Sequence, residues 1–152
     1  MKIAIGCDNA GESLLAVIRE QLADHQEIEV VDLSEPTGDE VEYYPDVAER
    51  VAKAVADGAS DRGILICGTG LGMAMTACKV PGIRAATCHD VYSAERAVKS
   101  NNAQILTMGE RVIGSESAKT VVEAWLNSEW EDGTRSEPKV QRMIEIEERL
   151  RK

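Results

Sequence analysis

Short apolar runs rich in β-branched residues alternate with longer runs of helical periodicity along the 152-residue chain. Parallel strands need long crossover connections, which are usually helices, so this alternation is typical of a parallel sheet covered by helices. Strands are expected at residues 1–7, 28–33, 63–67, 83–87 and 104–108. Helices are expected at residues 12–23, from Pro45 onward, and at residues 73–79, 93–99 and 117–126. The pattern predicts an α/β fold with a five-stranded parallel sheet.

The charge of the chain limits its partners. There are 17 Lys and Arg residues against 27 Asp and Glu residues, a formal net charge of −10 at pH 7. This surplus of carboxylates repels a phosphate backbone and argues against nucleic acid as a partner. No apolar run reaches the ~18 residues of a membrane-spanning helix, and the start, MKIAIGCDNAG, leads into strand-like residues instead of a signal peptide. We expect one cytoplasmic domain over residues 1–152, without membrane contact.

The four cysteines are Cys7, Cys67, Cys78 and Cys88. They form no CxxC pair and have no histidine at zinc-finger spacing. Hydrophobic residues make up 43% of the chain, enough to build a core without cross-links. We therefore expect neither a disulfide framework nor a metal site, and we expect Cys7, Cys78 and Cys88 to be small buried residues.

The composition changes after Trp130. A turn over residues 131–134 precedes a charged helix that is expected over residues 138–152. Its apolar residues form a narrow stripe, namely Val140, Met143, Ile144 and Ile146. Because so narrow a stripe more often packs on a neighbouring molecule than forms a core of its own, we expect this tail to contact a partner subunit in a homodimer.

Residues that directly follow strands are the first candidates for function. In an open parallel sheet, ligands bind outside the carboxyl ends of the strands. The segments that meet this condition are Asp8–Asn9, the loop near Tyr44, and residues 67–72, 88–90 and 109–111.

The third of these segments, Cys-Gly-Thr-Gly-Leu-Gly, carries the strongest signal. Glycines at alternate positions allow a sharp turn that points successive N–H groups into one pocket, which suits an oxyanion, although many α/β turns use glycine for packing alone. Cys67 stands at the end of the strand, just before a helix begins, where thiolates are readily formed. Met73 stands where a thiol phosphatase needs Arg, and neither GxGxxG nor the P-loop is matched, which argues against nucleotide cofactors.

A thiolate beside an oxyanion pocket suits the removal of a proton next to a carbonyl group. The thiolate takes the proton while the N–H groups hold the enediolate oxygen. Thr69 would add a hydroxyl donor to this chemistry, or it would serve as the N-cap of the next helix.

Several segments together resemble a known family. They are the opening MKIAIGCDNAG, the triplet Tyr44-Pro45-Asp46, the run DRGILICGTGLGMA with KVPGIRAA after it, the YSA of residues 92–94, and MGERVIG. The family is type B ribose-5-phosphate isomerase, with galactose-6-phosphate isomerase subunits and tetrose-phosphate isomerases among its relatives. The resemblance covers nearly the whole chain. It implies a Rossmann-like three-layer α/β sandwich, a homodimer or dimer of dimers, and aldose–ketose isomerisation through an enediolate, without metal or cofactor.

The resemblance assigns roles at the sugar end of the site. Cys67 matches the family's proton-transferring base. Asp8 and Asn9 match an Asp-His pair at the sugar and phosphate, with Asn9 a departure from His. The residues that match the pocket around the sugar's carbonyl end are Gly68, Gly70, Leu71 and Gly72, and Tyr44 joins them as a substrate-binding residue.

The resemblance also assigns the phosphate end. Asn101 matches a substrate-contacting Asn, and Arg111 matches a basic residue that faces the site. Arg135 and Lys139 match a pair of Arg residues that hold phosphate, and they would reach into a partner's cleft. Lys139 keeps the charge of the second Arg but loses its bidentate fork. Without the resemblance, charged residues at this spacing would be read as solvated surface.

Ser100 stands where the family has a His that opens the sugar ring. A serine hydroxyl is a poor proton shuttle near neutral pH. Either His89, after the fourth strand, has taken over this role, or the substrate has no ring to open. A four-carbon aldose phosphorylated at its fourth oxygen cannot close a furanose, so erythrose 4-phosphate and erythrulose 4-phosphate are the expected pair. Ribose 5-phosphate, or a role as one subunit of a heteromeric galactose-6-phosphate isomerase, is the alternative.

Overall fold

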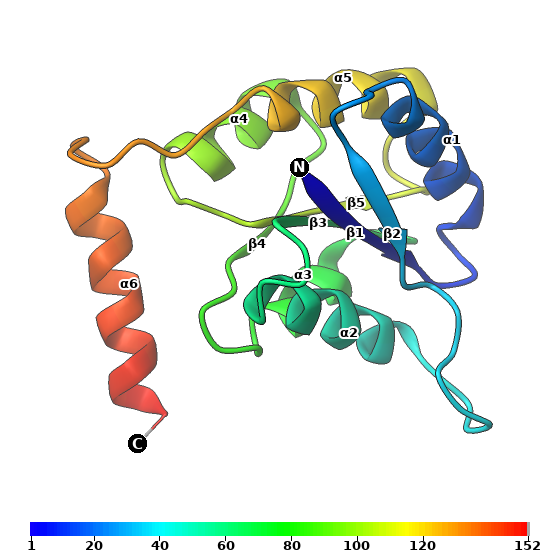
Figure 1. Cartoon of the computed structure of the whole chain (residues 1–152), viewed down its shortest axis with the longest axis horizontal. Helices are drawn as coiled ribbons and strands as arrows, with labels where there is room; N and C mark the ends of the chain where they lie inside the picture. Colours follow the sequence, from blue (N-terminus) through cyan, green and yellow to red (C-terminus); the bar gives the residue numbers. More distant parts are fainter. Residues whose placement is uncertain (152) are drawn as a thin grey trace.

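The computed structural model describes residues 1–151, and it contains five strands and six helices (Figure 1). In chain order they are β1 Lys2–Cys7, α1 Glu12–Ala23, β2 Glu29–Asp32, α2 Tyr44–Ala56, β3 Arg62–Cys67, α3 Leu71–Ala77, β4 Ala85–Thr87, α4 Val91–Lys99, β5 Ile105–Gly109, α5 Ser115–Leu126 and α6 Glu137–Leu150. The alternation that the sequence predicts is confirmed. Lys152, the last residue of the expected tail helix, lies outside the described residues.

All strand pairs are parallel, in the order β2-β1-β3-β5-β4. The chain passes from β1 to β2 on one side and then returns to β3 on the other side of β1. The connections after β1 and β3 also leave the sheet on opposite faces, because α1 and α3 pack in different cores. Such a reversal opens a crevice between the carboxyl ends of the two strands. Asp8 and Cys67–Gly68 stand at this crevice.

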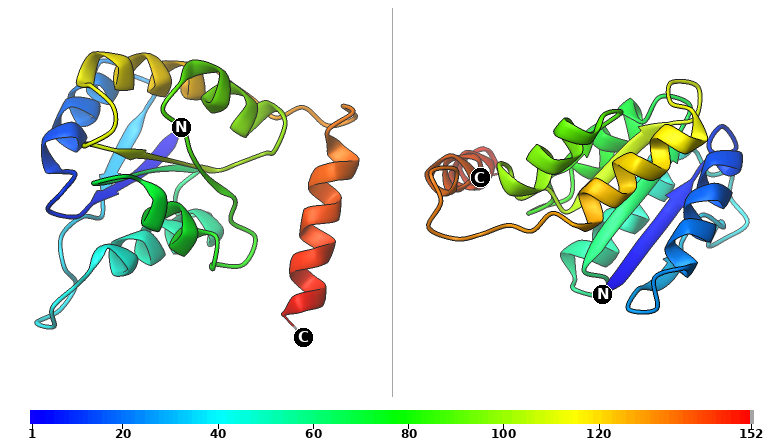
Figure 2. Two further views of the ribbon diagram at one scale, coloured as in Figure 1. Left: turned by 180° about the vertical axis from the view of Figure 1, so that it is seen from behind. Right: turned by 90° about the horizontal axis from the view of Figure 1, so that it is seen from above.

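Helices cover both faces of the sheet, as the two views of Figure 2 show. On one face, Ile18 of α1 and Trp125 of α5 are buried against the strands together with residues of α4. On the other face, Val51 of α2 and Met73 of α3 are buried against Leu65 and Cys67 of β3. The three-layer α/β sandwich is thus confirmed, and the side chain of Cys67 lies on the face that α2 and α3 cover.

Helices α3, α4 and α5 each begin two residues earlier than their apolar periodicity predicts. α3 starts at Leu71, because Gly70, with φ of +77°, turns the chain directly into the helix. Leu71 and Gly72, expected in the loop, therefore belong to the first helical turn. α4 starts at Val91, because the carboxylate of Asp90 accepts the Ser93 N–H at 2.7 Å and caps the helix.

β4 is shorter than expected, since residues 83 and 84 are not part of it. The N–H of Arg84 donates to the side-chain Oε1 of Gln104 at 2.9 Å instead of joining the ladder. The other element boundaries agree with the sequence to within one or two residues.

The tail helix α6 stands apart from the α/β sandwich in Figure 1. It has one buried residue, Val140, while Met143 and Ile146 of the expected stripe are exposed. Its end is fastened to the turn before β4, where the Gly82 N–H donates to the Glu147 carboxylate at 3.1 Å. The contact of this helix with a partner stays a prediction. None of the described helices is both long enough and apolar enough to cross a bilayer.

Candidate active site

Cys67 ends β3 in the middle of the sheet, between β1 and β5. Its side chain is buried, with a relative exposure of 6%. The Gly70 N–H donates to Sγ of Cys67 at 3.1 Å, because the turn of residues 68–70 folds back over the end of the strand. An N–H donor directed at sulfur stabilises negative charge on that atom. The expected pairing of a thiol with the glycine turn is therefore present in the structure.

The glycine turn is fixed from β5 and the loop after it. The N–H groups of Glu110 and Arg111 donate to the carbonyl oxygens of Cys67 and Gly68 at 2.9 and 3.0 Å. The buried hydroxyl of Thr107 donates to the Gly70 carbonyl at 2.9 Å. Sequence reasoning missed Thr107, for which the available signal was a lone hydroxyl residue inside an otherwise apolar buried strand.

The turn packs so closely on β5 that side chains are excluded at two positions. A Cβ at Gly70 would lie 2.8–3.0 Å from the backbone of Met108. A Cβ at Gly109 would overlap the backbone of Thr69. These glycines thus allow the turn to pack directly on the backbone of β5. This packing places the Gly70 N–H on the sulfur of Cys67.

Arg111, Tyr44 and Thr69 also surround the turn. The Arg111 guanidinium lies over Gly68, with Nη1 3.1 Å from the position of a Cβ there. The Tyr44 ring lies against Gly72, since a Cβ at Gly72 would overlap it. The exposed Thr69 accepts the Leu71 N–H on its hydroxyl at 3.3 Å, but the N-cap residue itself is Gly70. Thr69 therefore supports the helix start and stays accessible to a ligand.

His89 is hydrogen-bonded to the end of β5, the strand that pairs with the end of β3 where Cys67 stands. Its Nε2 accepts the N–H of Gly109 at 2.9 Å, and Gly109 pairs with Cys67 across the sheet. Burial lowers the pKa of His89, against the opposing effect of the Asp90 carboxylate. Since Nε2 acts as an acceptor, the bound form is the neutral ring with its proton on Nδ1.

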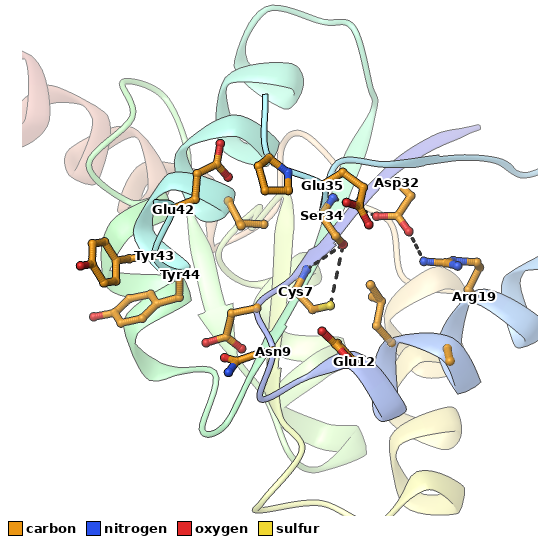
Figure 3. A pocket seen from close by; sticks show the side chains of 15 residues that line it. Cys7, Asn9, Glu12, Arg19, Asp32, Ser34, Glu35, Glu42, Tyr43 and Tyr44 are labelled. Atoms are coloured by element: carbon orange, nitrogen blue, oxygen red, sulfur yellow. Dashed lines mark hydrogen bonds and ion pairs between the residues drawn. The ribbon is translucent and has the colours of Figure 1, made fainter. Parts of the chain in front are cut away.

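Asp8 and Asn9 line a cavity of about 690 Å³ (Figure 3). Asp8 also accepts the Ala10 N–H at 3.0 Å and so shapes the turn after β1. The cavity extends toward the end of β2 and shares Asp8, Asn9 and Tyr44 with the expected site, but Cys67 does not line it. Its acidic lining residues are Asp8, Glu12, Asp32, Glu35 and Glu42.

A further carboxylate, that of Glu110, occupies a position near the crevice where an anion could otherwise bind. Glu110 accepts the Leu14 N–H at 2.9 Å, at the start of α1. Helix N-termini of this kind hold the phosphates of dinucleotides in related folds, and here a side chain occupies the position. Sequence reasoning did not single out Glu110, which lies 96 residues from Leu14 along the chain.

The remaining expected site residues lie at the other end of the strands from Cys67, where the strands begin. Ser100 is the C-cap of α4, and the chain just after it pairs with the start of β3, where the Gly63 N–H donates to the Gln104 carbonyl at 3.0 Å. β3 has six residues, so its two ends are roughly 17 Å apart. Asn101 lies beside Ser100, with its amide bound to the Arg96 carbonyl at 3.1 Å. One chain therefore does not bring these residues to Cys67.

Arg135 and Lys139 also lie away from Cys67. Arg135 lines a cavity of about 250 Å³ next to the end of α4, together with Arg96 and Lys99. Lys139 is exposed in the first turn of α6. Because α6 begins at Glu137, Arg135 precedes the helix, and the two cations do not share a helical face.

The other three cysteines differ in their burial. Cys7 and Cys88 are buried as expected, and burial raises the pKa of Cys88 to about 11, so that this thiol stays protonated. The expectation for Cys78 was wrong, because this residue is exposed. Its sulfur lies at the end of α3, where it accepts the Ala85 N–H at 3.3 Å.

Comparison with known proteins identifies the family of this chain. Residues 3–143 match the Ribose/Galactose Isomerase family, and the chain belongs to that family. It is 52% identical to D-erythrulose-4-phosphate isomerase of Pectobacterium atrosepticum over 94% of this chain and 93% of the relative. It is 50% identical to Ribose-5-P isomerase B of Listeria innocua over 99% and 100% of the two chains. The expectation of an aldose–ketose isomerase is confirmed at this level.

A solved structure gives the same result for the fold. Ribose-5-phosphate isomerase B of Clostridium thermocellum superposes with a TM-score of 0.90 at 44% identity, over 99% of both chains. The Rossmann-like architecture expected from the sequence is therefore confirmed across the whole domain.

We expect Gly70→Ala to remove most of the activity. A side chain at Gly70 is strained by its positive φ and would also push the turn off Met108, which moves the N–H donor away from Cys67. Gly58→Ala is the matched control, since Gly58 has φ of +74° with no neighbour within 4 Å of its Cβ position. Both variants should lose roughly 1–2 kcal/mol of unfolding free energy to backbone strain, and Gly70→Ala more. Equal losses in stability and activity for the two variants would contradict the role of the close approach.

Proposed function

We propose that the protein interconverts erythrose 4-phosphate and erythrulose 4-phosphate, with the thiolate of Cys67 as the base. The observation that carries this assignment is the Gly70 N–H directed at the Cys67 sulfur at 3.1 Å, at the carboxyl end of a central strand. Relatives of nearly equal identity are named for tetrose and for pentose phosphates. They support the reaction class, and the choice of substrate rests on the chain's own residues.

The chemistry is a proton transfer within one molecule. The thiolate removes the proton from C2 of the aldose, and the C1–C2 enediolate forms with negative charge on O1. A proton then passes from O2 to O1, and the thiol donates a proton to C1, which yields the ketose and restores the thiolate. No oxidant is consumed, because both hydrogen movements stay within the substrate and the protein.

Three groups around Cys67 suit the charge that develops on the oxygens. Backbone N–H groups of the glycine turn and the Arg111 guanidinium, which lies over Gly68, would hold the enediolate. The accessible hydroxyl of Thr69 would pass the proton between O1 and O2. Asp8 and Asn9, across the crevice, would orient the sugar hydroxyls.

Ser100 favours the four-carbon substrate. The resemblance places a ring-opening His at this position, and serine does not replace it near neutral pH. Erythrose 4-phosphate has no furanose ring, because the oxygen that would close the ring carries the phosphate. His89 is the other candidate for ring opening, but its Nε2 is already engaged by the Gly109 N–H, which leaves only Nδ1.

The site is completed by a second copy of the chain in this proposal. The residues to be supplied by the second copy lie at or near the end of α4, away from Cys67 of their own chain. They are Ser100, Asn101 and Arg135. A twofold axis would place the end of α4 of one subunit over the crevice of the other subunit and would form two equal sites. Exposed apolar side chains lie in the segments that follow β3, β4 and β5 and would form the interface, namely Leu71, Met75, Val91, Tyr92 and Val112.

We expect Cys67→Ala to lower kcat by at least ~100-fold while leaving the fold intact, because general-base catalysis contributes roughly 10²–10⁴ in rate. Cys78→Ala is the control, as this thiol is exposed and lies outside the crevice. The assay follows ketose formation from erythrose 4-phosphate. A Cys67→Ala enzyme that retains near-normal kcat would remove the assignment of the base.

A comparison of sugar phosphates tests how many carbon atoms the preferred substrate has. We expect catalytic efficiency to be highest on erythrose 4-phosphate and lower on ribose 5-phosphate and on a hexose 6-phosphate. His89→Ala should leave this order unchanged. A preference for ribose 5-phosphate that disappears in His89→Ala would instead establish His89 as the ring-opening residue. A pure chain that is inactive alone but active with a paralogous chain would favour the heteromeric alternative.

Hybrid dimers test whether the site is shared. Cys67→Ala and the double variant Arg135→Ala/Lys139→Ala are each expected to be nearly inactive. After the two are unfolded together in equal amounts and refolded, half of the dimers are hybrids with one intact site, so about a quarter of normal activity should return. Recovery of no activity, with dimers present, would show that each site lies within one chain.

A further inference from the structure

A second cavity lies away from Cys67, between the end of α4 and the turn that precedes α6. Its volume is about 250 Å³. It is lined by the cations Arg96, Lys99 and Arg135, by the carboxylates Glu129 and Glu131, and by Thr134 and Ser136. Sequence reasoning had selected Arg135 from this group but not Arg96.

Arg96 has hydrogen-bonding capacity that the chain leaves unused. Its Nη2 donates to Glu95 at 2.6 Å, while Nη1 has a contact of 3.4 Å with the Ser100 hydroxyl, at the limit of a hydrogen bond. Its Nε is buried without a partner among the described residues. Such a buried donor destabilises the protein until an acceptor reaches it.

The turn before α6, on the other side of the cavity, also carries polar atoms without a hydrogen-bond partner in the described part of the chain. Thr134 Oγ1 is buried and has no hydrogen-bond partner within residues 1–151. Arg135 makes no side-chain hydrogen bond or ion pair in that same part of the chain. Unsatisfied polar atoms thus approach one small cavity from two segments, α4 and the turn before α6, which is the arrangement expected of a site for a ligand rich in acceptor oxygens.

The chemistry of the site also calls for a second guanidinium. Phosphate is best held by arginine, whose planar fork donates two parallel hydrogen bonds. Of the pair expected here, Lys139 lacks the fork and does not line the cavity. Arg96 does line it, together with Arg135, and Glu95 takes only one of its terminal nitrogens.

We propose that Arg96 is a ligand of the substrate phosphate and that it sets the preference for a four-carbon chain. This inference rests on the proposed function, because the cavity joins the partner's Cys67 only in the shared site. Arg96 lies one helical turn before Ser100, on the same side of α4, and its guanidinium reaches the Ser100 hydroxyl. A phosphate bound there lies beside the position of the missing ring-opening group and leaves less room for extra carbons.

Carboxylates limit how strongly this cavity attracts anions. Glu95 pairs with both Arg96 and Lys99, at 2.6 and 3.5 Å, and Glu129 and Glu131 line the same cavity. Recognition therefore depends on the geometry of the guanidinium more than on net charge. Arg96→Lys, which retains the charge but not the fork, should behave more like Arg96→Gln than like the unaltered protein.

The test compares Arg96→Gln with Arg142→Gln, an exposed arginine on α6 that serves as the matched control. Arg96→Gln should raise KM for erythrose 4-phosphate by ~10-fold or more at nearly constant kcat, since a hydrogen bond to a charged group is worth a factor of this size. The ratio of catalytic efficiency for erythrose 4-phosphate over ribose 5-phosphate should fall as well. A merely structural role would lower the unfolding midpoint and reduce both substrates equally.

Calorimetric titration with inorganic phosphate makes the result independent of catalysis. We expect the unaltered protein and Arg142→Gln to bind phosphate alike, and Arg96→Gln to bind it at least ~10-fold more weakly. Equal phosphate affinity in all three proteins, or an unchanged KM and substrate ratio in Arg96→Gln, would overturn the role of Arg96 while leaving the isomerase intact. A protein that binds phosphate through Arg96 but isomerises none of the sugars would instead refute the proposed function.

Discussion

The hydrogen bond from the Gly70 N–H to the Cys67 sulfur is the interaction on which the rest of the site depends. It requires a turn that returns over the end of β3, and that turn fits only because glycines replace side chains where it meets β5. The hydroxyl of Thr107 and two backbone N–H groups after β5 then hold the turn in place. A buried thiol thereby gains a donor suited to its charged form in a setting that would otherwise disfavour charge.

The distribution of charge explains why half of the expected site lies elsewhere. The cavity next to the crevice is lined by five carboxylates, among them Asp8 and Asp32, and Arg19 is already paired with Asp32. Such a surface repels a phosphate group. Arg135 lies near Arg96 and Lys99, next to the end of α4 and away from this cavity. In the proposed shared site, these cations of a second copy would bring positive charge to the sugar phosphate.

The sequence was sufficient for the fold and for the crevice. Apolar periodicity located all five strands and all six helices, because buried faces repeat along the chain, and the residues after β1 and β3 were found from the rule that ligands bind at carboxyl ends. The start of α3 was missed because the positive φ of Gly70 begins a helix without any apolar signal. Thr107 and Arg96 were missed, and Glu110 was included in the candidate segment 109–111 without a role, because these roles depend on partners distant in sequence or on a cavity.

Exchange of hydrogen with solvent tests the central claim, that the Cys67 thiolate moves a substrate proton, most directly. The isomerisation of erythrose 4-phosphate is run in D₂O, and the products are examined by proton NMR at C1 and C2. The account predicts deuterium at the carbon that receives the proton, with the exchange lost in Cys67→Ser. Ketose that forms at a normal rate in Cys67→Ser, or exchange that persists in that variant, would contradict it.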